Sequence, residues 1–246
     1  MRQLLYLFLL LAVNIGYSQE KIETSPDQYE TPSTVPAGRF QMENRFTVKD
    51  DGSHASTFIL PSTNWKYGIN DNVEVLVVTD LVFQKTPDST SSGLQPIHFG
   101  LKVKLWDAKG ALPDAAISMQ IAVRKLASKD WKASYLAPNL RLLLKNKITD
   151  KISAGINLGG IWDGETPDPH FFYSVSPKFK LSQKWECFIE AYGYLRETST
   201  AENWADGGLM YLITNDIQVE LSGGYELSAS NGSHRYFGLA GFAFRI

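Results

Sequence analysis

From residue 38 to the end of the chain, apolar and polar side chains alternate with a period of two. Leu101 and Val103, for example, alternate with Lys102 and Lys104. Successive side chains of a β-strand point to opposite faces, so this pattern predicts strands with one apolar and one polar face. It predicts an all-β fold.

Turn-forming residues divide this stretch into about twelve strands. We expect the strands at about 38–48, 57–69, 73–83, 97–105, 117–123, 135–144, 152–162, 171–181, 185–192, 206–213, 217–226 and 236–246. The segments between them are alternately short and longer, with a long segment at 107–113 and a short one at 127–131 as exceptions. Short periplasmic turns that alternate with longer outer loops are typical of bacterial outer-membrane barrels.

The apolar face of these strands fits lipid better than a protein core. Charged residues occupy the polar face even on strands that would be central in a sheet, and aromatic residues such as Trp65, Trp185 and Tyr236 stand near strand ends. Aromatic girdles at strand ends mark the two membrane interfaces. A soluble secreted β-sandwich or barrel is the alternative. We expect a transmembrane antiparallel up-and-down β-barrel of about twelve strands in the outer membrane of a Gram-negative bacterium.

The two ends of the chain agree with this location. Residues 1–18 combine a basic start, an apolar run and small residues before Gln19, which predicts a secretory signal peptide. Residues 19–37 contain several prolines and no periodicity, so we expect an extended segment in the periplasm or a partial plug of the lumen. Residues 38–246 form the expected barrel. Its last strand ends in the apolar Ile246, which predicts contact with the barrel assembly machinery as well as with outer-membrane lipid.

The charges on the polar face are separated by sign along the chain. The expected basic wall of the lumen consists of Lys102, Lys104, Arg124, Arg141, Lys178 and Lys180. The expected acidic wall consists of Glu186, Glu190, Asp206, Glu220 and Glu226. Opposed walls in a water-filled pore would create a transverse field that orients dipolar solutes. This pattern favours a channel for small polar or amphipathic molecules; the alternative is a structural barrel whose lumen is closed by charge pairs.

Other functions find little support in the sequence. The net charge of −2 argues against nucleic acid as a partner. A membrane-embedded hydrolase would need a nucleophile beside a histidine base, yet His98 alone is expected inside the barrel, and nothing ties it to Ser174 or Ser176. The histidines and the single cysteine lack the spacing of metal ligands. We therefore expect no enzyme activity, no metal and no cofactor.

Three segments carry a family resemblance. They are Ser25 to Glu43, with the sequence SPDQYETPSTVPAGRFQME, then Tyr67 to Glu74, YGINDNVE, and Gly100 to Leu105, GLKVKL. Together they resemble the landmarks of the MetA-pathway phenol-degradation family of outer-membrane transporters, although Thr24-Ser25-Pro26 stands in place of an Asp-Arg-Pro triplet. The resemblance covers most of the chain after the signal peptide. It implies an outer-membrane barrel that passes small molecules, hydrophobic or aromatic ones among them.

Overall fold

A computed structural model describes residues 21–52, 55–196, 200–228 and 234–246. The predicted signal peptide lies outside these residues. The strands are β1 (Phe40–Asp50), β2 (Ser56–Asn70), β3 (Val73–Lys85), β4 (Thr90–Leu94), β5 (Ile97–Trp106), β6 (Asp114–Val123), β7 (Ala137–Lys147), β8 (Ile152–Ile161), β9 (His170–Lys180), β10 (Trp185–Leu195), β11 (Glu202–Thr214), β12 (Ile217–Glu226) and β13 (Tyr236–Arg245). One short 3₁₀-helix, η1 (Lys129–Trp131), lies between β6 and β7.

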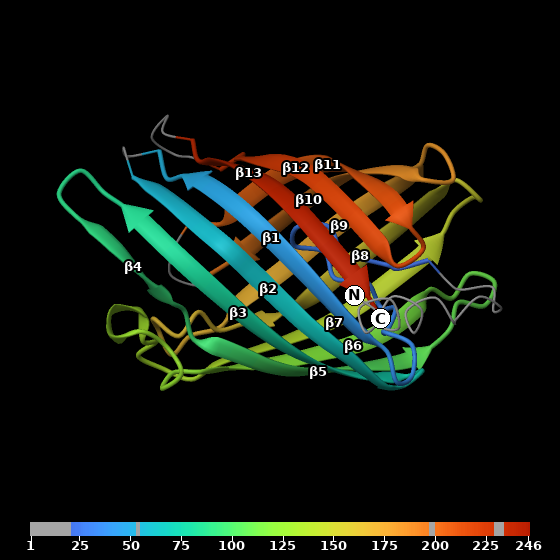
Figure 1. Ribbon diagram of the computed structural model, residues 1–246, viewed down its shortest axis with the longest axis horizontal. Helices are drawn as coiled ribbons and strands as arrows, with labels where there is room; N and C mark the ends of the chain where they lie inside the picture. Colours follow the sequence, from blue (N-terminus) through green and yellow to red (C-terminus); the bar gives the residue numbers. More distant parts are fainter. Residues whose placement is uncertain (1–20, 53–54, 197–199, 229–233) are drawn as a thin grey trace, which may run out of the picture.

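The strands close into an antiparallel barrel (Figure 1). Each strand pairs with its neighbours in sequence, except that β3 pairs with β5 past the short strand β4. The barrel closes where β1 pairs with β13 from Gln41–Arg245 to Asp50–Tyr236. Without β4 the closed ring contains twelve strands, which confirms the predicted fold and strand number.

The strands differ from those expected in several places. The segment 85–94, expected as a polar loop, contains β4, which extends the outer end of β3 as a hairpin around Thr86 and Ser89. β11 begins at Glu202 rather than near 206, because residues 202–205 continue the ladder with β10. β6 begins at Asp114 and ends at Val123, so Arg124 follows the strand instead of belonging to it. Polar composition alone hides such short extensions, whose backbone pairing supplies the stabilisation.

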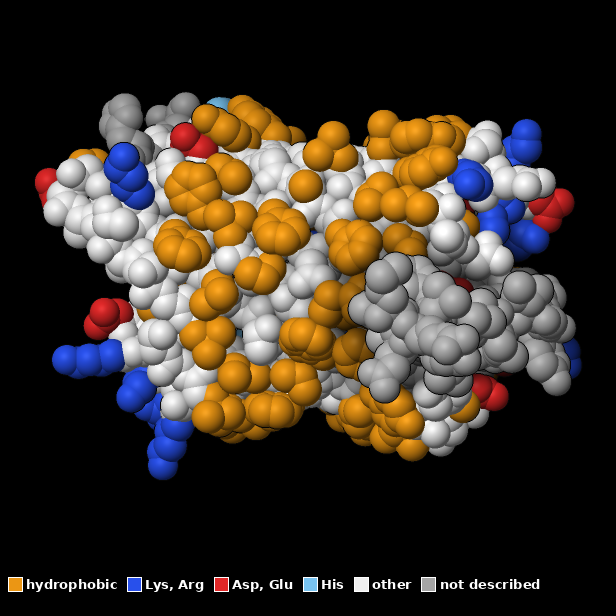
Figure 2. All heavy atoms as spheres, in the orientation of Figure 1, with side chains coloured by type: hydrophobic (Ala, Val, Ile, Leu, Met, Phe, Trp, Pro, Cys, Tyr) orange, Lys and Arg blue, Asp and Glu red, His pale blue; other side chains and the backbone are white. Residues whose placement is uncertain are grey.

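The outer surface of the barrel is apolar around its middle. Figure 2 shows hydrophobic side chains spread over the strands, with charged side chains gathered at the two ends of the molecule. Leu140, Ile189 and Leu221 are at least half exposed although they lie within strands. In the described part of the chain, no helix is long and apolar enough to cross a membrane. An apolar belt between polar ends is the surface expected of a barrel in lipid.

The interior contains two kinds of side chains. Near the outer end, where the longer loops lie, Phe172, Tyr192, Trp204, Phe237 and Leu239 form a buried apolar cluster. Towards the periplasmic end, which carries the short turns and the C-terminus, the interior is polar and charged. Residues 21–37 pass through this polar part, drawn in blue inside the barrel in Figure 1. We call residues 21–37 the lumen segment.

Candidate functional site

The lumen segment enters and leaves the barrel at the same end. At its start, the Ile22 amide donates a hydrogen bond of 2.7 Å to the carbonyl of Asn215, in the turn between β11 and β12. At its end, the Gly38 amide donates a bond of 2.8 Å to the carbonyl of Gly68 on β2. The first and last parts of the segment are therefore both fixed at the periplasmic end, and its middle reaches into the barrel.

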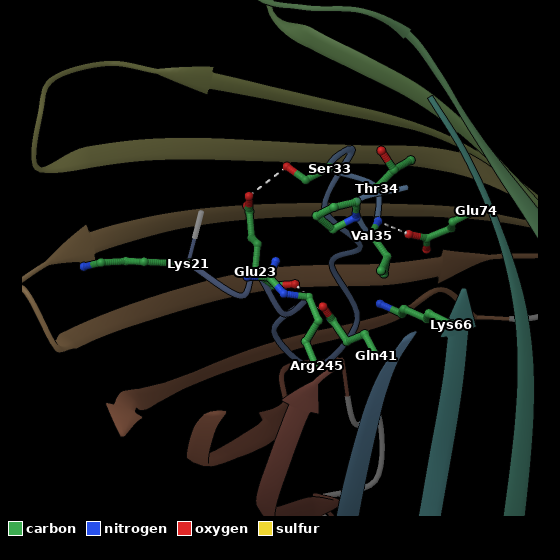
Figure 3. A pocket seen from close by; sticks show the side chains of 10 residues that line it. Lys21, Glu23, Ser33, Thr34, Val35, Gln41, Lys66, Glu74 and Arg245 are labelled. Carbon is green, nitrogen blue, oxygen red and sulfur yellow. Dashed lines mark hydrogen bonds between the residues drawn. The ribbon is translucent and has the colours of Figure 1, made fainter. Parts of the chain in front are cut away.

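Glu23 links the first part of the lumen segment to its last part. Its carboxylate accepts hydrogen bonds from the hydroxyls of Thr31 (2.8 Å) and Ser33 (2.7 Å), the latter drawn in Figure 3. It also forms an ion pair with Lys145 of β7 at 2.5 Å. Burial of this carboxyl works to raise its pKa, but Lys145 and Lys178 outweigh burial, so the pKa of Glu23 lies below its ordinary value. Glu23 is thus an ionised anchor between the segment and the wall.

Lys102 of β5 is the most deeply buried charge of the expected basic wall. It is fully buried, and its ammonium group lies 3.0 Å from Glu74 of β3 and 3.3 Å from Glu30 of the lumen segment. Lys102 also donates to the carbonyl of Ser33 at 3.1 Å. Burial tends to raise the pKa of Glu30, yet the nearby Lys102 lowers it below the ordinary value. The wall and the segment therefore share one buried charge network.

Other members of the basic wall contact the backbone of the segment. Arg141 of β7 donates to the carbonyl of Gln28 at 3.0 Å, and Lys178 of β9 donates to the carbonyl of Thr24 at 3.4 Å. Lys104 pairs with the nearby Asp107 at the periplasmic rim. Because its strand ends at Val123, Arg124 instead donates to the carbonyl of Ala133 in the following loop, at 2.7 Å.

The expected acidic wall is brought together only in its middle. Glu190 of β10 and Asp206 of β11 are opposite each other in the ladder, and Glu220 of β12 is buried with them. Glu186 lies towards the periplasmic end, whereas Glu226 pairs with Arg235 at the outer rim at 2.7 Å.

The central carboxylates have few hydrogen bonds. One oxygen of Glu190 accepts from the Gln28 amide at 3.3 Å. Within the described residues, the other oxygen of Glu190 and both oxygens of Asp206 are buried without a hydrogen-bond partner. Arg45 of β1, which donates to the carbonyl of Ser25 at 2.5 Å, brings a positive charge to the same region. The lumen segment thus passes between the two walls, which do not face each other across an open pore.

Sequence reasoning missed the charged residues of the first three strands as part of this site. Lys66 of β2 and Glu43 of β1 form a buried ion pair at 2.7 Å. Glu74 of β3 accepts a hydrogen bond of 2.7 Å from the Val35 amide of the lumen segment, as Figure 3 shows. The alternating pattern already placed these side chains on the polar face. The contact of Glu74 with Val35 has no signal in the sequence.

One close approach fixes the tip of the segment. Tyr29 is 3% exposed and lies against Gly155 of β8, where an added Cβ would be 2.1 Å from the nearest ring carbon. Burial raises the pKa of the Tyr29 hydroxyl well above its ordinary value. The absence of a side chain at Gly155 makes room for the aromatic ring.

The free space around the segment lies at the periplasmic end. A cavity of about 670 Å³ is bounded by the segment itself and by Asp71, Lys104 and Asp114. A smaller cavity of about 70 Å³, shown in Figure 3, lies between the segment and Gln41, Lys66, Glu74 and Arg245. These cavities form a polar vestibule that the segment separates from the aromatic cluster near the outer end.

The residues considered for hydrolysis are not assembled. His98 lies on β5, and Ser174 and Ser176 lie on β9, a strand that does not neighbour β5. The hydroxyls of both serines are buried without a hydrogen-bond partner among the described residues. The same part of the chain contains no cluster of three or more histidine, cysteine or acidic residues arranged for a metal ion.

A family model matches this chain in sequence, and solved structures match it in fold. The sequence model of the family described as "Putative MetA-pathway of phenol degradation" matches residues 24–246. No curated protein matches the sequence.

Several solved structures share the fold. An outer-membrane channel from Pseudomonas putida F1 is similar with a TM-score of 0.66 and 10% identity, over 91% of this chain and 100% of that one. The KdgM porin has a TM-score of 0.53 and 8% identity over 82% and 98% of the two chains. The transport unit of the autotransporter AIDA-I from Escherichia coli has a TM-score of 0.52 and 9% identity over 91% and 93%. These similarities show that the chain shares its fold with these structures.

Proposed function

This chain belongs to the family named "Putative MetA-pathway of phenol degradation", and we propose that it is an outer-membrane channel for small polar or amphipathic molecules, aromatic ones included. In this proposal the lumen segment is the constriction that a solute must pass or displace. Movement through the barrel is by diffusion. The aromatic cluster near the outer end and the charged vestibule at the periplasmic end suit an amphipathic solute.

The observation that carries the proposal is the way in which the lumen segment is held. Its contacts with the wall are mostly hydrogen bonds and ion pairs, such as Glu23–Lys145 and Val35–Glu74. Water can replace such contacts at a modest net cost, since a hydrogen bond to a charged group inside a protein contributes about 1.5–3 kcal/mol. A segment held in this way can shift without unfolding the barrel, whose strands are joined independently of it by β1–β13 pairing.

The similarity to the channel from Pseudomonas putida F1 and to the KdgM porin supports the same class of function by fold. We further propose that β13 is the strand read by the barrel assembly machinery. Its residues Tyr236 and Phe242, together with Ile246 directly after the strand, are exposed on one face.

Liposome swelling with the refolded protein tests the channel. We expect neutral sugars of pentose size to enter liposomes containing the wild-type protein slowly, and those containing a variant that lacks residues 22–36 faster. A folded barrel that passes no solute in either form would contradict the proposal and would support the structural barrel with a closed, charge-paired lumen. Turnover of an ester or lipid substrate, abolished by His98→Ala, would instead support the hydrolase.

A further inference from the structure

A third cavity at the periplasmic end is lined by five lysines among eleven residues. It has a volume of about 280 Å³ and lies between the ends of β7, β8 and β9, on the side of the barrel away from β1 (Figure 1). Its lysines are Lys145, Lys147, Lys151, Lys178 and Lys180. We call this space the lysine cavity.

The lysine cavity has an excess of positive charge. Three carboxylates line it beside the five lysines, namely Asp114, Asp150 and Glu186, and Glu23 is paired with Lys145, which leaves one net positive charge. Lys147 is paired with Asp150 at 2.7 Å, and both are well exposed at the rim. In the described part of the chain, Lys151 and Lys180 have neither an ion pair nor a side-chain hydrogen bond.

Like charges gathered in a concave site repel one another and attract an ion of opposite sign. Each ammonium group is a compact charge with three donors and no acceptor, so the ligand that matches several of them carries several anionic oxygens. The attraction grows in proportion to the charge of the ligand, so a singly charged ion gains about half as much from the excess as a doubly charged one. A ligand with two charges gains more from the excess.

We propose that the lysine cavity binds a small soluble anion with two or more negative charges, such as a phosphate or a dicarboxylate. Lys151 and Lys180 provide the free donors of the site. Binding here requires only the cavity and does not depend on passage of solute through the barrel.

The site is linked to the lumen segment through two of its lysines. Lys145 is paired with Glu23, and Lys178 donates to the carbonyl of Thr24. An anion in the cavity competes with Glu23 for the charge of Lys145. This step rests on the proposed function: by competing for Lys145, the anion weakens the attachment of the first part of the segment to the wall and so acts as a regulator.

Calorimetric titration of inorganic phosphate into the full-length protein, in non-ionic detergent at low ionic strength, tests the site. We expect the double variant K151Q/K180Q to bind phosphate roughly a hundredfold more weakly, from about tenfold for each lysine. The control K129Q/K132Q removes the same charge from the outer loop, where both lysines are exposed, and should leave the affinity unchanged. Equal weakening in both variants, or no binding by the wild-type protein, would overturn the proposal.

A variant with the opposite expected effect distinguishes phosphate binding in the lysine cavity from nonspecific attraction of phosphate to positive charge. Glu23→Gln removes the competitor for Lys145 and should tighten phosphate binding about tenfold, whereas Glu165→Gln in an exposed loop should not. Unchanged affinity in the Glu23 variant would refute competition at Lys145. The swelling assay with a neutral sugar remains a separate measure, so a barrel that passes no sugar can still bind phosphate, and the two failures are distinguishable.

Discussion

Replacing Gly155 by alanine should displace the lumen segment from its packed position in the barrel. A Cβ at this position would lie 2.1 Å and 2.2 Å from two carbons of the Tyr29 ring and 2.5 Å from its hydroxyl. Carbon atoms in ordinary contact are about 3.5–4.0 Å apart, so the ring must move by more than about 1 Å. Tyr29 is 3% exposed and has little room for such a movement.

The size of the effect follows from the cost of this overlap. Forcing an extra carbon into a packed site costs about 1–3 kcal/mol. Here the cost destabilises only the form in which Tyr29 packs against residue 155. A change of about 1–3 kcal/mol shifts a two-state equilibrium by roughly 5- to 150-fold. Gly155→Ala should therefore raise the displaced fraction of the segment by a factor in this range.

Single-channel recording in planar bilayers measures this fraction as open time. The matched control is Gly238→Ala on β13, where an added Cβ meets nothing within 4 Å. Tyr29→Ala should cancel the effect of Gly155→Ala, because the ring that the new methyl group meets is gone. If Gly155→Ala showed the open time of the wild-type protein, together with unchanged protease resistance of residues 21–37, the displacement argument would be wrong.

Two further predictions concern the charges around the segment. Lys102→Met leaves the buried Glu74 without its cation and should lower the free energy of unfolding by about 3–5 kcal/mol in urea titrations, whereas Lys85→Met at an exposed position should change it little. The ion pair with Lys145 lowers the pKa of Glu23. The ionised carboxylate therefore holds the segment fully at any pH above the ordinary glutamate pKa, and this stabilisation is lost only as the pH falls through the lowered pKa. Proteolysis of residues 21–37 should therefore stay slow when the pH is reduced from 7 to about 5, which is still above the ordinary glutamate pKa. Rapid cleavage within that interval would show that ionised Glu23 does not anchor the segment.

The architecture could be predicted because it depends on a local, repeating signal. In a strand, the position of a residue in the two-residue period decides whether it faces lipid or lumen. Ile189 and Glu190 follow this rule, because the apolar member is exposed and the charged member is buried; beside the buried Lys102, Leu101 is partly exposed. Neither assignment requires knowledge of a distant residue.

Boundaries were harder to predict than faces. Arg124 continues the alternation of β6 but lies past its last ladder pair, so its side chain reaches a loop carbonyl instead of the lumen. β4 was missed because a short hairpin of serine, threonine and glycine has the composition of a loop. In both places backbone hydrogen bonding with a neighbouring strand decides the outcome, and the side-chain pattern does not report it.

The sequence by itself determined that this chain forms a closed barrel of about twelve strands and, within the strands, which face of each points inward. Only the tertiary structure decided what fills the lumen. Residues 21–37 have no periodicity, and their position depends on partners far away in the chain, such as Lys102, Lys145 and Gly155. Contacts of this kind arise only when the barrel has closed and brought distant strands around one segment, so no local pattern could encode them.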